Sequence, residues 1–352
     1  MTPASQPRTL QTIGEFGLIR ELQKHCQTLH SDVIQGIGDD AALLRTSHKE
    51  ALIASTDLAI EGVHFDLAFE SFKDVGHRLA VANISDIAAM GGTPKYLLLA
   101  LAIPPSYAVS DLRALYQGFK KPCQAHDISL VGGDTSSSKS GLFLCFTILG
   151  HVPPKQALTR QSAKVGDKVY VTGTLGDSKA GLQILQRQAK QQTSHADQPY
   201  ERFLKKRHLR PTPRLAIGQH LSKDRLAHAA IDVSDGLSGD ILHLCQASQV
   251  GVELWASHLP ISRQCQTYTA NHCPNPIDFA LAGGEDYELL FTIPSRNQGK
   301  VSDLSRVLKT KMTCIGEIKP KSFGLRLKLK GGTSRNISRQ SYDHFSKKRS
   351  KF

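Results

Sequence analysis

Acidic residues that recur in short glycine-rich clusters are the part of this sequence best suited to chemistry. Each cluster stands where an apolar run ends, and the carboxylate returns in segments far apart in the chain. Asp and Gly are common turn residues, so one cluster alone has the composition of an ordinary turn. Ordinary turns would vary the polar residue, and the repetition therefore favours a shared role. The clusters are Gly36-Ile-Gly-Asp39-Asp40, Ser55-Thr56-Asp57, Gly132-Gly-Asp134-Thr135, Asp232-Val-Ser-Asp235-Gly236 and Gly283-Gly-Glu285-Asp286.

Carboxylates that gather in space repel one another unless cations lie between them. Asn83 and Asp86 extend the set, because they stand three residues apart on one face of a mostly apolar helix. An acid on such a face is costly to bury without a partner. Mg²⁺ prefers hard oxygen ligands and usually shares them with substrate phosphates. We therefore predict a site that holds several Mg²⁺ ions and binds a polyphosphate.

Two glycine-rich segments offer other ways to bind phosphate. Gly36–Ala41 has the spacing of the dinucleotide fingerprint, but only a short apolar run precedes it and its own acids would face the pyrophosphate. No GxxxxGK[ST] motif occurs, which excludes a P-loop kinase. Gly173–Ser178 precedes a helix and could present N–H groups to an anion. A capped tight turn is the simpler interpretation of that segment.

Strands and helices that alternate along both halves of the chain must position the clusters. Apolar runs predict strands, and apolar residues at helical spacing predict helices, one of which stops at Gly91-Gly92. The class is therefore α/β or α+β. The strands expected are 51–55, 96–103, 128–131, 142–150, 168–172 and 288–293, an apolar run at 226–233 ends in an acidic cluster, the helices are 16–26, 72–90, 110–126, 178–188 and 238–248, and 189–200 is expected to be a surface loop.

Length and composition predict a two-domain globular protein. The chain has 352 residues, and roughly 150 residues per domain is a common size. The 40% hydrophobic and 21% charged fractions exclude a mostly disordered chain. His151-Val-Pro-Pro154 is the expected linker, so the domains are 1–150 and 151–345, with 346–352 as a basic tail.

Charge, cysteines and hydropathy restrict the partners and the compartment. Residues 321–352 carry ten Lys/Arg and one acid, so most of the net charge of +13 belongs to the tail, and the body is not a nucleic-acid binder by composition. The seven cysteines are odd in number and show no CxxC spacing, which indicates a reducing cytoplasm. The longest apolar stretch, 96–105, is half a membrane span, and residues 1–14 do not read as a signal peptide. We expect a cytoplasmic protein with neither a membrane nor a specific nucleic-acid partner.

In this order, the clusters resemble those of the thiamine-monophosphate kinases, a family within the superfamily of aminoimidazole ribonucleotide synthetase. The resemblance covers nearly the whole chain, and it departs from the family pattern at Ser341, where Gly is common, and in the basic tail after Phe345. The matching segments are Gly14-Glu-Phe16, 36–40, 55–57, Gly62-Val-His64-Phe65, Asn83-Ile-Ser-Asp86-Ile-Ala-Ala-Met-Gly91, 132–135, Ala157-Leu-Thr-Arg160, Val171-Thr-Gly173, Arg207-His-Leu-Arg-Pro211, 231–237, 283–288 and Tyr342-Asp-His-Phe345.

The resemblance implies a reaction and a role for each motif residue. The γ-phosphoryl group of ATP would pass to thiamine monophosphate, giving thiamine diphosphate and ADP. Metal roles are implied for Asp40, Ser55, Thr56, Asp57, Asp86, Asp134, Asp232 and Asp235. Nucleotide contacts are implied for Gly133, Asp134, Arg160 and Ser234, and catalytic roles for Asp57, Asp134, Arg160 and Asp235. The thiamine moiety would lie near His64, Glu285 and Tyr342.

The resemblance also implies an architecture. An N-terminal mixed sheet with helices would bind ATP and Mg²⁺ and would pair with its copy in a homodimer. A C-terminal α/β domain would complete the nucleotide and substrate site. Together these make the two-domain fold of the aminoimidazole ribonucleotide synthetase superfamily.

Two alternatives stay open at this point. The first is another ATP-using member of the superfamily with a different acceptor. Selenophosphate-forming relatives carry a reactive cysteine or selenocysteine near the start, and hydrogenase-maturation relatives end in cysteine, whereas Gly14–Gly17 holds no cysteine and the last residue is Phe352. The second is a nucleotide- or Ca²⁺-binding module whose acids only hold metal. Ca²⁺ loops place their ligands within about a dozen residues, and here the acids are widely spread.

Overall fold

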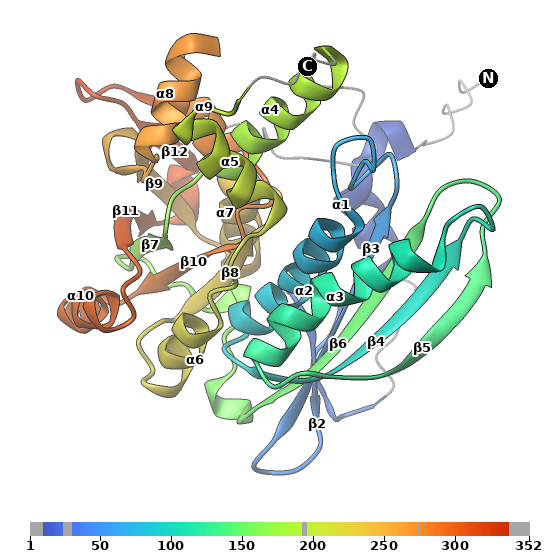
Figure 1. Ribbon diagram of the computed structural model, residues 1–352. Coiled ribbons are helices and arrows are strands. Elements are labelled where there is room, and N and C mark those ends of the chain that lie inside the picture. Colours follow the sequence, from blue (N-terminus) through green and yellow to red (C-terminus); the bar gives the residue numbers. More distant parts are fainter. Residues whose placement is uncertain (1–9, 24–29, 192–195, 273–274, 338–352) are drawn as a thin grey trace, which may run out of the picture.

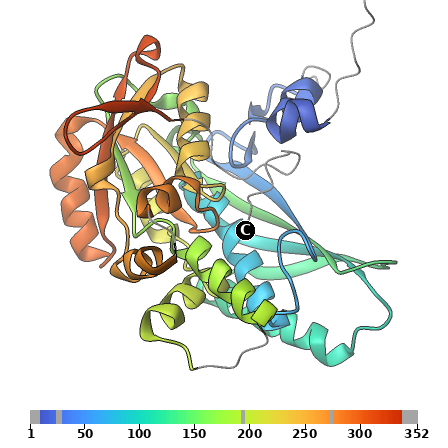
Figure 2. The ribbon, with the colours of Figure 1, turned by 90° about the horizontal axis from the view of Figure 1, so that it is seen from above.

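The computed structural model describes residues 10–23, 30–191, 196–272 and 275–337. Two units lie side by side, each built on one sheet with helices packed on it (Figure 1). Seen from above, the first sheet extends away from the second unit (Figure 2). Tyr342 and the tail 346–352 lie outside the described residues.

The first sheet has six strands in the order β1-β2-β3-β6-β4-β5. Its strands are antiparallel neighbours except β4 and β5, which run parallel, so the sheet is mixed as expected. Helices α2 and α3 cover one face, and α1 lies near the edge (Figure 1). The bounds are β1 Val33–Gln35, β2 Ala42–Arg45, β3 Ala51–Ile60, β4 Thr93–Ile103, β5 Ser129–Ser137, β6 Phe143–Val152, α1 Leu10–Gln23, α2 Phe72–Ala89 and α3 Val109–Ala125.

The contact between α2 and α3 depends on small residues. An added Cβ at Gly76 would lie 2.2 Å from the Leu115 carbonyl oxygen, and one at Gly118 would lie 2.1 Å from the Lys73 carbonyl oxygen. Only glycine allows the two backbones to approach this closely. The two helices therefore pack closely, and α2 also contacts β8 and α6 of the second unit.

The second sheet has seven strands in the order β13-β12-β9-β11-β7-β10-β8. Its centre is antiparallel, and β12 runs parallel to β9. The bounds are β7 Lys168–Thr172, β8 Ala229–Val233, β9 Gly251–Trp255, β10 Glu288–Ile293, β11 Met312–Lys319, β12 Leu325–Lys328, β13 Ser334–Asn336, α4 Asp177–Gln191, α5 Pro199–Leu209, α6 Leu215–Lys223, α7 Leu237–Ser248, α8 Arg263–His272, α9 Pro276–Ala282 and α10 Gln298–Val307.

Several strands continue beyond the apolar runs that predicted them. β3 extends to Ile60 and β5 to Ser137, while β6 continues through Val152 into the expected linker. Asp57 and Asp134 therefore lie inside strands and not after them. Ladder hydrogen bonds to neighbouring strands hold these polar residues extended, and no local pattern reports such bonds. In addition, residues 199 and 200, expected in a surface loop, begin α5.

Two further observations bear on the environment of the protein. Among the described residues, none of the helices combines the length and apolar character needed to cross a bilayer. Free thiols are found at Cys123, Cys145, Cys245, Cys265 and Cys314.

Candidate active site

Three carboxylates from distant segments meet between the two units. Asp40 stands between β1 and β2, Asp86 lies on α2, and Asp232 lies on β8 of the second sheet. One oxygen from each lies within 4.8 Å of the others, a spacing that a metal ion could bridge. We call these three residues the carboxylate cluster. Asp57 on β3 is close enough for its charge to raise the pKa of Asp86.

Serine hydroxyls fix the orientation of the carboxylate cluster. Ser55 Oγ lies 2.5 Å from Asp86 Oδ2 and 3.2 Å from the Asp40 carbonyl oxygen. Ser85 Oγ donates to Asp232 Oδ2 at 2.7 Å, and Ser234 Oγ donates to Asp232 Oδ1 at 3.1 Å. Each of these carboxylates still has accepting capacity for a cation.

Arg160 supplies positive charge beside the cluster. Its Nη2 is 2.5 Å from Asp40 Oδ1 and its Nε is 3.3 Å from Asp40 Oδ2, a two-point contact. Its backbone N–H donates to Asp39 Oδ2 at 3.1 Å, and its carbonyl accepts from Ser248 Oγ at 2.6 Å. The side chain is 16% exposed, so Arg160 is held in the site and is not a freely solvated surface residue.

The electrostatics of the site favour protons or cations on its acids. Burial, assisted by the charge of Asp40, raises the pKa of Asp39 and that of Asp232 to about 7. Burial raises the pKa of Asp57 to about 6. Burial and the charges of neighbouring acids, Asp57 first, raise the pKa of Asp86 well above its usual range. A set of carboxylates with one facing arginine and raised pKa values fits divalent cations bound through oxygen.

Two acids near the site received no role from the sequence. Asp39 stands beside Asp40 in the first cluster. Asp240 is buried on α7 and accepts from the Gly236 backbone N–H at 3.0 Å. Burial raises the pKa of Asp240, and the charges of Asp235 and Asp232 raise it further. The signal for Asp240 was weak, because it stands inside a helix after the acidic cluster ends.

Thr56 and Asp134 lie on the other face of the first sheet. Asp57 is the cross-strand partner of Phe146, which is fully buried on the face covered by the helices, so Asp57 points to that face. Thr56 points the opposite way, with its Oγ1 3.0 Å from Thr147 Oγ1. Asp134 is exposed, is level with Ala100, and shares that outer face.

Asp134 is also too far along the sheet to meet Asp57 in the same chain. The strands β6 and β4 separate β3 from β5, which amounts to about 14 Å at the usual strand spacing. The structure therefore does not bring the side chains of Thr56 and Asp134 into the carboxylate cluster. The neighbouring Gly133 has a packing reason for its identity, because an added Cβ would lie 1.9 Å from the Leu99 carbonyl oxygen.

His64 and Glu285, both expected near the substrate, are brought to one arginine. Arg78 Nη2 donates to the His64 carbonyl at 2.8 Å, and Arg78 Nη1 lies 2.9 Å from Glu285 Oε2. His64 Nδ1 accepts from the Ile60 N–H at 3.0 Å. The Glu285 side chain is 31% exposed. Tyr342, the third expected substrate residue, lies outside the described residues.

The turn before α4 binds a carboxylate of the chain itself. Asp286 Oδ2 accepts from the Gly176 N–H at 2.6 Å, and Asp286 Oδ1 accepts from the Ser178 N–H at 3.0 Å. These donors are therefore satisfied internally, which agrees with the simpler interpretation of Gly173–Ser178 as a capped turn.

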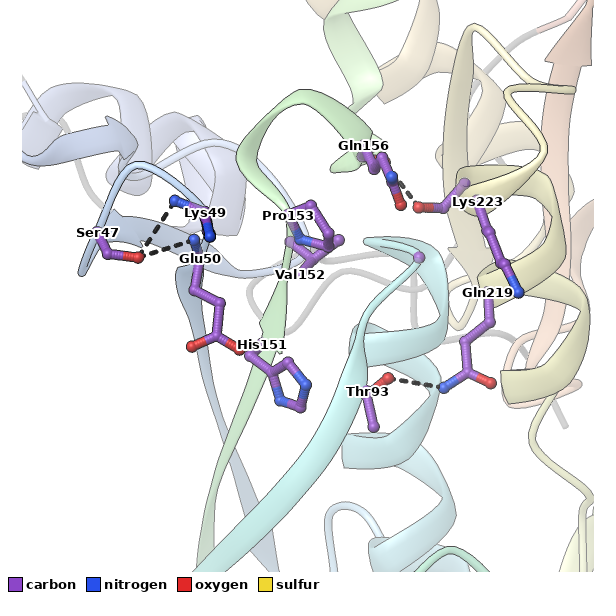
Figure 3. A pocket seen from close by; sticks show the side chains of 12 residues that line it. Ser47, Lys49, Glu50, Thr93, His151, Val152, Pro153, Gln156, Gln219 and Lys223 are labelled. Carbon is purple, nitrogen blue, oxygen red and sulfur yellow. Dashed lines mark hydrogen bonds between the residues drawn. The ribbon is translucent and has the colours of Figure 1, made fainter.

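A separate cavity lies away from these residues. It has a volume of about 740 Å³ and is formed by the β2–β3 turn, the end of α2, the end of β6 and α6 (Figure 3). Its lining includes Lys49, Glu50, His151, Gln219 and Lys223. None of the predicted site residues lines it, so the chemistry expected from the sequence does not belong there.

Family models match both units. The N-terminal domain of AIR synthase related protein matches residues 38–152, and the C-terminal domain of AIR synthase related protein matches residues 164–328. These matches cover most of the chain and both sheets. Both units thus belong to the AIR synthase related proteins.

Curated relatives indicate which family of the AIR synthase related proteins this chain belongs to. The thiamine-monophosphate kinase of Bacillus subtilis (strain 168) is 36% identical over 334 residues, covering 95% of this chain and 100% of the relative. That of Escherichia coli (strain K12) is 39% identical over 333 residues, covering 95% and 98%. The chain belongs to the thiamine-monophosphate kinase family.

Solved structures support the same family assignment. A structure described as AaThiL complexed with AMPPCP and TMP has a TM-score of 0.83 at 35% identity, covering 97% of this chain and all of that one. The thiamine monophosphate kinase of Aquifex aeolicus has a TM-score of 0.74 at 33% identity, covering 91% and 98%. The E. coli hydrogenase maturation protein HypE has a TM-score of 0.66 at 20% identity, covering 91% and 96%, and shares the fold alone.

Proposed function

We propose that this protein transfers the γ-phosphoryl group of ATP to thiamine monophosphate, producing thiamine diphosphate and ADP. The observation that carries the proposal is the carboxylate cluster between the two units, with Arg160 beside it. Support comes from the curated relatives named thiamine-monophosphate kinase and from the similar structure that contains AMPPCP and TMP.

The main obstacle in this reaction is the repulsion between two polyanions. Unit charges 4 Å apart cost about 4 kcal/mol at an effective dielectric of about 20, and each phosphate partner carries more than one charge. Mg²⁺ ions, when bound, offset this repulsion and hold donor and acceptor oxygens in line. Asp40, Asp57, Asp86 and Asp232 would hold them, with Ser55 as a further oxygen ligand. Asp235 is proposed to join this set from the turn before α7.

The chain's own residues orient the reactants and need not supply a base. A phosphate monoester has a second pKa of about 6 and is mostly dianionic near pH 7, so the acceptor is already a nucleophile. Arg160 is proposed to offset negative charge on the transferred group. Ser234, together with Gly133, is proposed to contact the nucleotide. His64 and Glu285 are proposed to face the thiamine moiety, with Tyr342.

We propose that the active protein is a homodimer in which Asp134 acts on the partner's site. β5 is an edge strand with nine exposed residues, and large apolar side chains, Leu58, Tyr96 and Val131, are exposed on the same sheet. Edge strands of this kind pair readily with another chain. β6 pairs with β3 along its whole length, but β2 pairs only with residues 51–54 of β3. A partner's β5 beside the following residues of β3 would bring its Asp134 to Thr56, which faces the same side of the sheet.

A mixing experiment tests this arrangement. Asp57→Asn and Asp134→Asn homodimers should each be inactive. If the site is shared, a mixed dimer keeps one intact site, and an equal mixture after subunit exchange should regain about one quarter of wild-type turnover. If Asp134 acts within its own chain, the mixture stays inactive.

An acceptor panel tests the reaction itself. Purified protein with ATP and Mg²⁺ is offered thiamine monophosphate, free thiamine and other phosphate monoesters, and the diphosphate product is measured. Turnover confined to thiamine monophosphate supports the proposal. Preference for an unrelated acceptor would favour another ATP-using member of the superfamily, and metal binding without turnover would favour a binding module. The free thiols are consistent with our proposal that the protein works in the cytoplasm.

A further inference from the structure

Arg78 lies at the boundary between the two units and received no role from the sequence. It is on α2, and only 4% of its surface is exposed. It is the one charged residue between Asp74 and Asp86 in the sequence. A buried guanidinium must have its charge and its N–H groups satisfied by partners, so those partners reveal what it organises.

The partners of Arg78 come from three separate segments. Nη2 is 2.8 Å from the His64 carbonyl oxygen and 2.8 Å from Glu70 Oε2. Nη1 is 3.0 Å and 2.9 Å from the two carboxylate oxygens of Glu285. Nη1 is also 3.2 Å from Nε2 of His208, a fully buried residue at the end of α5. One planar fork therefore joins the loop after β3 to the turn before β10.

We propose that Arg78 is the positioning residue of the acceptor site, fixing the distance between His64 and Glu285 so that both face the thiamine moiety. The inference rests on the proposed function. His64 belongs to the first unit and Glu285 to the second, so their spacing is not set by either sheet alone. Arg78 bonds to both.

The rest of the contact set makes this position rigid. Glu285 has a left-handed backbone with φ of 61°, and its N–H donates to the Ser234 carbonyl at 2.7 Å. His208 is held from its other side by Ser178 Oγ at 3.0 Å. A guanidinium can meet a carbonyl and two carboxylates in one plane, whereas a lysine ammonium offers no such fork.

The charges favour a cationic acceptor ring. Arg78 faces two carboxylates, Glu70 and Glu285, and burial raises the pKa of Glu70 to about 7. The charge of Arg78 is therefore matched by Glu285 when Glu70 is protonated, and one negative charge is in excess when both acids are ionised. Glu70 is buried, while Glu285 is partly exposed. The excess negative charge is therefore presented at Glu285, where the positively charged thiazolium of the acceptor would be attracted.

Steady-state kinetics of Arg78→Gln, Arg78→Lys and a matched control test the inference. Arg210→Gln is the control, because Arg210 Nε also joins α2 to the end of α5, through Asp74 at 2.6 Å, but its side chain is 52% exposed, unlike the buried side chain of Arg78. We expect Arg78→Gln to raise the KM for thiamine monophosphate by about tenfold or more while the KM for ATP changes by less than about twofold. Arg78→Lys should restore part of this loss, and Arg210→Gln should leave both constants near wild type.

The outcomes separate this inference from the proposed function. Equal losses toward both substrates, or an unchanged KM for thiamine monophosphate in a folded Arg78→Gln variant, would overturn the positioning role. If Arg78→Gln does not fold, the double variant Glu70→Gln/Arg78→Gln removes the unpaired buried carboxylate and should still show the raised KM; a normal KM in it would also overturn the role. A wild-type protein that does not phosphorylate thiamine monophosphate at all would instead refute the proposed function.

Discussion

Two buried charged regions of this molecule differ in how completely their charges are matched. Glu288 is fully buried and meets Arg214 at 2.5 and 2.6 Å, Arg207 at 2.8 Å and Thr172 Oγ1 at 2.5 Å. Despite burial, these arginines, Arg214 first, hold the pKa of Glu288 below its usual value. In the carboxylate cluster the acids outnumber Arg160, and burial raises the pKa values of Asp86 and Asp232.

The contrast separates a structural ion network from a site prepared for a ligand. The side chains around Glu288 satisfy both its charge and its hydrogen bonds. In the carboxylate cluster, serine hydroxyls orient the acids but do not neutralise their charge. We therefore propose that the carboxylate cluster binds cations. The following changes should affect the two regions in opposite ways.

The largest expected effect is the loss of activity in Asp57→Asn. Removing this carboxylate takes away a proposed metal ligand, so we expect the rate of ADP formation to fall by at least about 10³-fold. The same change relieves repulsion with Asp86, so the melting temperature should stay the same or rise. Coupled-enzyme kinetics and thermal melts measure the two effects. Full ADP production by a folded variant would contradict the metal role.

Glu288→Gln should show the reverse pattern, with a large effect on stability. The change leaves Arg207 and Arg214 without their buried carboxylate. Breaking a buried ion pair costs about 3–5 kcal/mol, and urea unfolding would measure it. Unfolding free energy close to that of wild type would mean that the network is not structural, and the contrast between the two regions would fail.

The pH dependence of stability should reveal the unmatched acids. The pKa values of Asp39, Asp57 and Asp232 are raised from 3.8 to about 7, 6 and 7. The folded state then holds protons more tightly than the unfolded chain. The stability from these groups is therefore present below about pH 4 and is lost as pH rises through about 7.

Mg²⁺ should reverse this loss. Binding to the folded state alone raises stability, and it requires ionised carboxylates, so the increase in melting temperature should be larger at pH 8 than at pH 5.5. Thermal melts with EDTA or with Mg²⁺ at both pH values measure it, and Glu288→Gln should keep the Mg²⁺ response that Asp86→Asn loses. An equal response at both pH values would argue against binding at the raised-pKa acids.

The smallest expected effect concerns charge that belongs to neither region. Residues 346–352 lie outside every site motif and carry four Lys/Arg. Deleting them should leave kcat/KM for thiamine monophosphate within about twofold of wild type, since none of the proposed site residues is removed. A large fall in kcat/KM would show that the tail takes part in substrate binding.

The sequence predicted the site correctly where one residue type recurs along the chain. It failed where the position of a side chain depends on neighbouring strands. The recurrent aspartates predicted that Asp40, Asp86 and Asp232 would meet, and strands 168–172 and 288–293 follow from their apolar runs. The same reasoning grouped Asp134 with them. Within one chain, however, Asp134 lies on β5, three strands from β3, and on the opposite face of the sheet from the cluster.

Arg78 illustrates what could not be predicted. Its neighbours in sequence show only a charged residue in an apolar helix. Its role depends on partners that are 14 residues upstream and 130 and 207 residues downstream. Such convergence is a property of the packed units and not of any local pattern.

The most direct test of the central claim is anomalous diffraction from crystals grown with Mn²⁺ in place of Mg²⁺ and a non-hydrolysable ATP analogue. We predict anomalous peaks within about 2.5 Å of oxygens of Asp40, Asp86 and Asp232, next to the β- and γ-phosphates of the analogue. Phosphates bound elsewhere, with no anomalous peak among these three carboxylates, would contradict the claim.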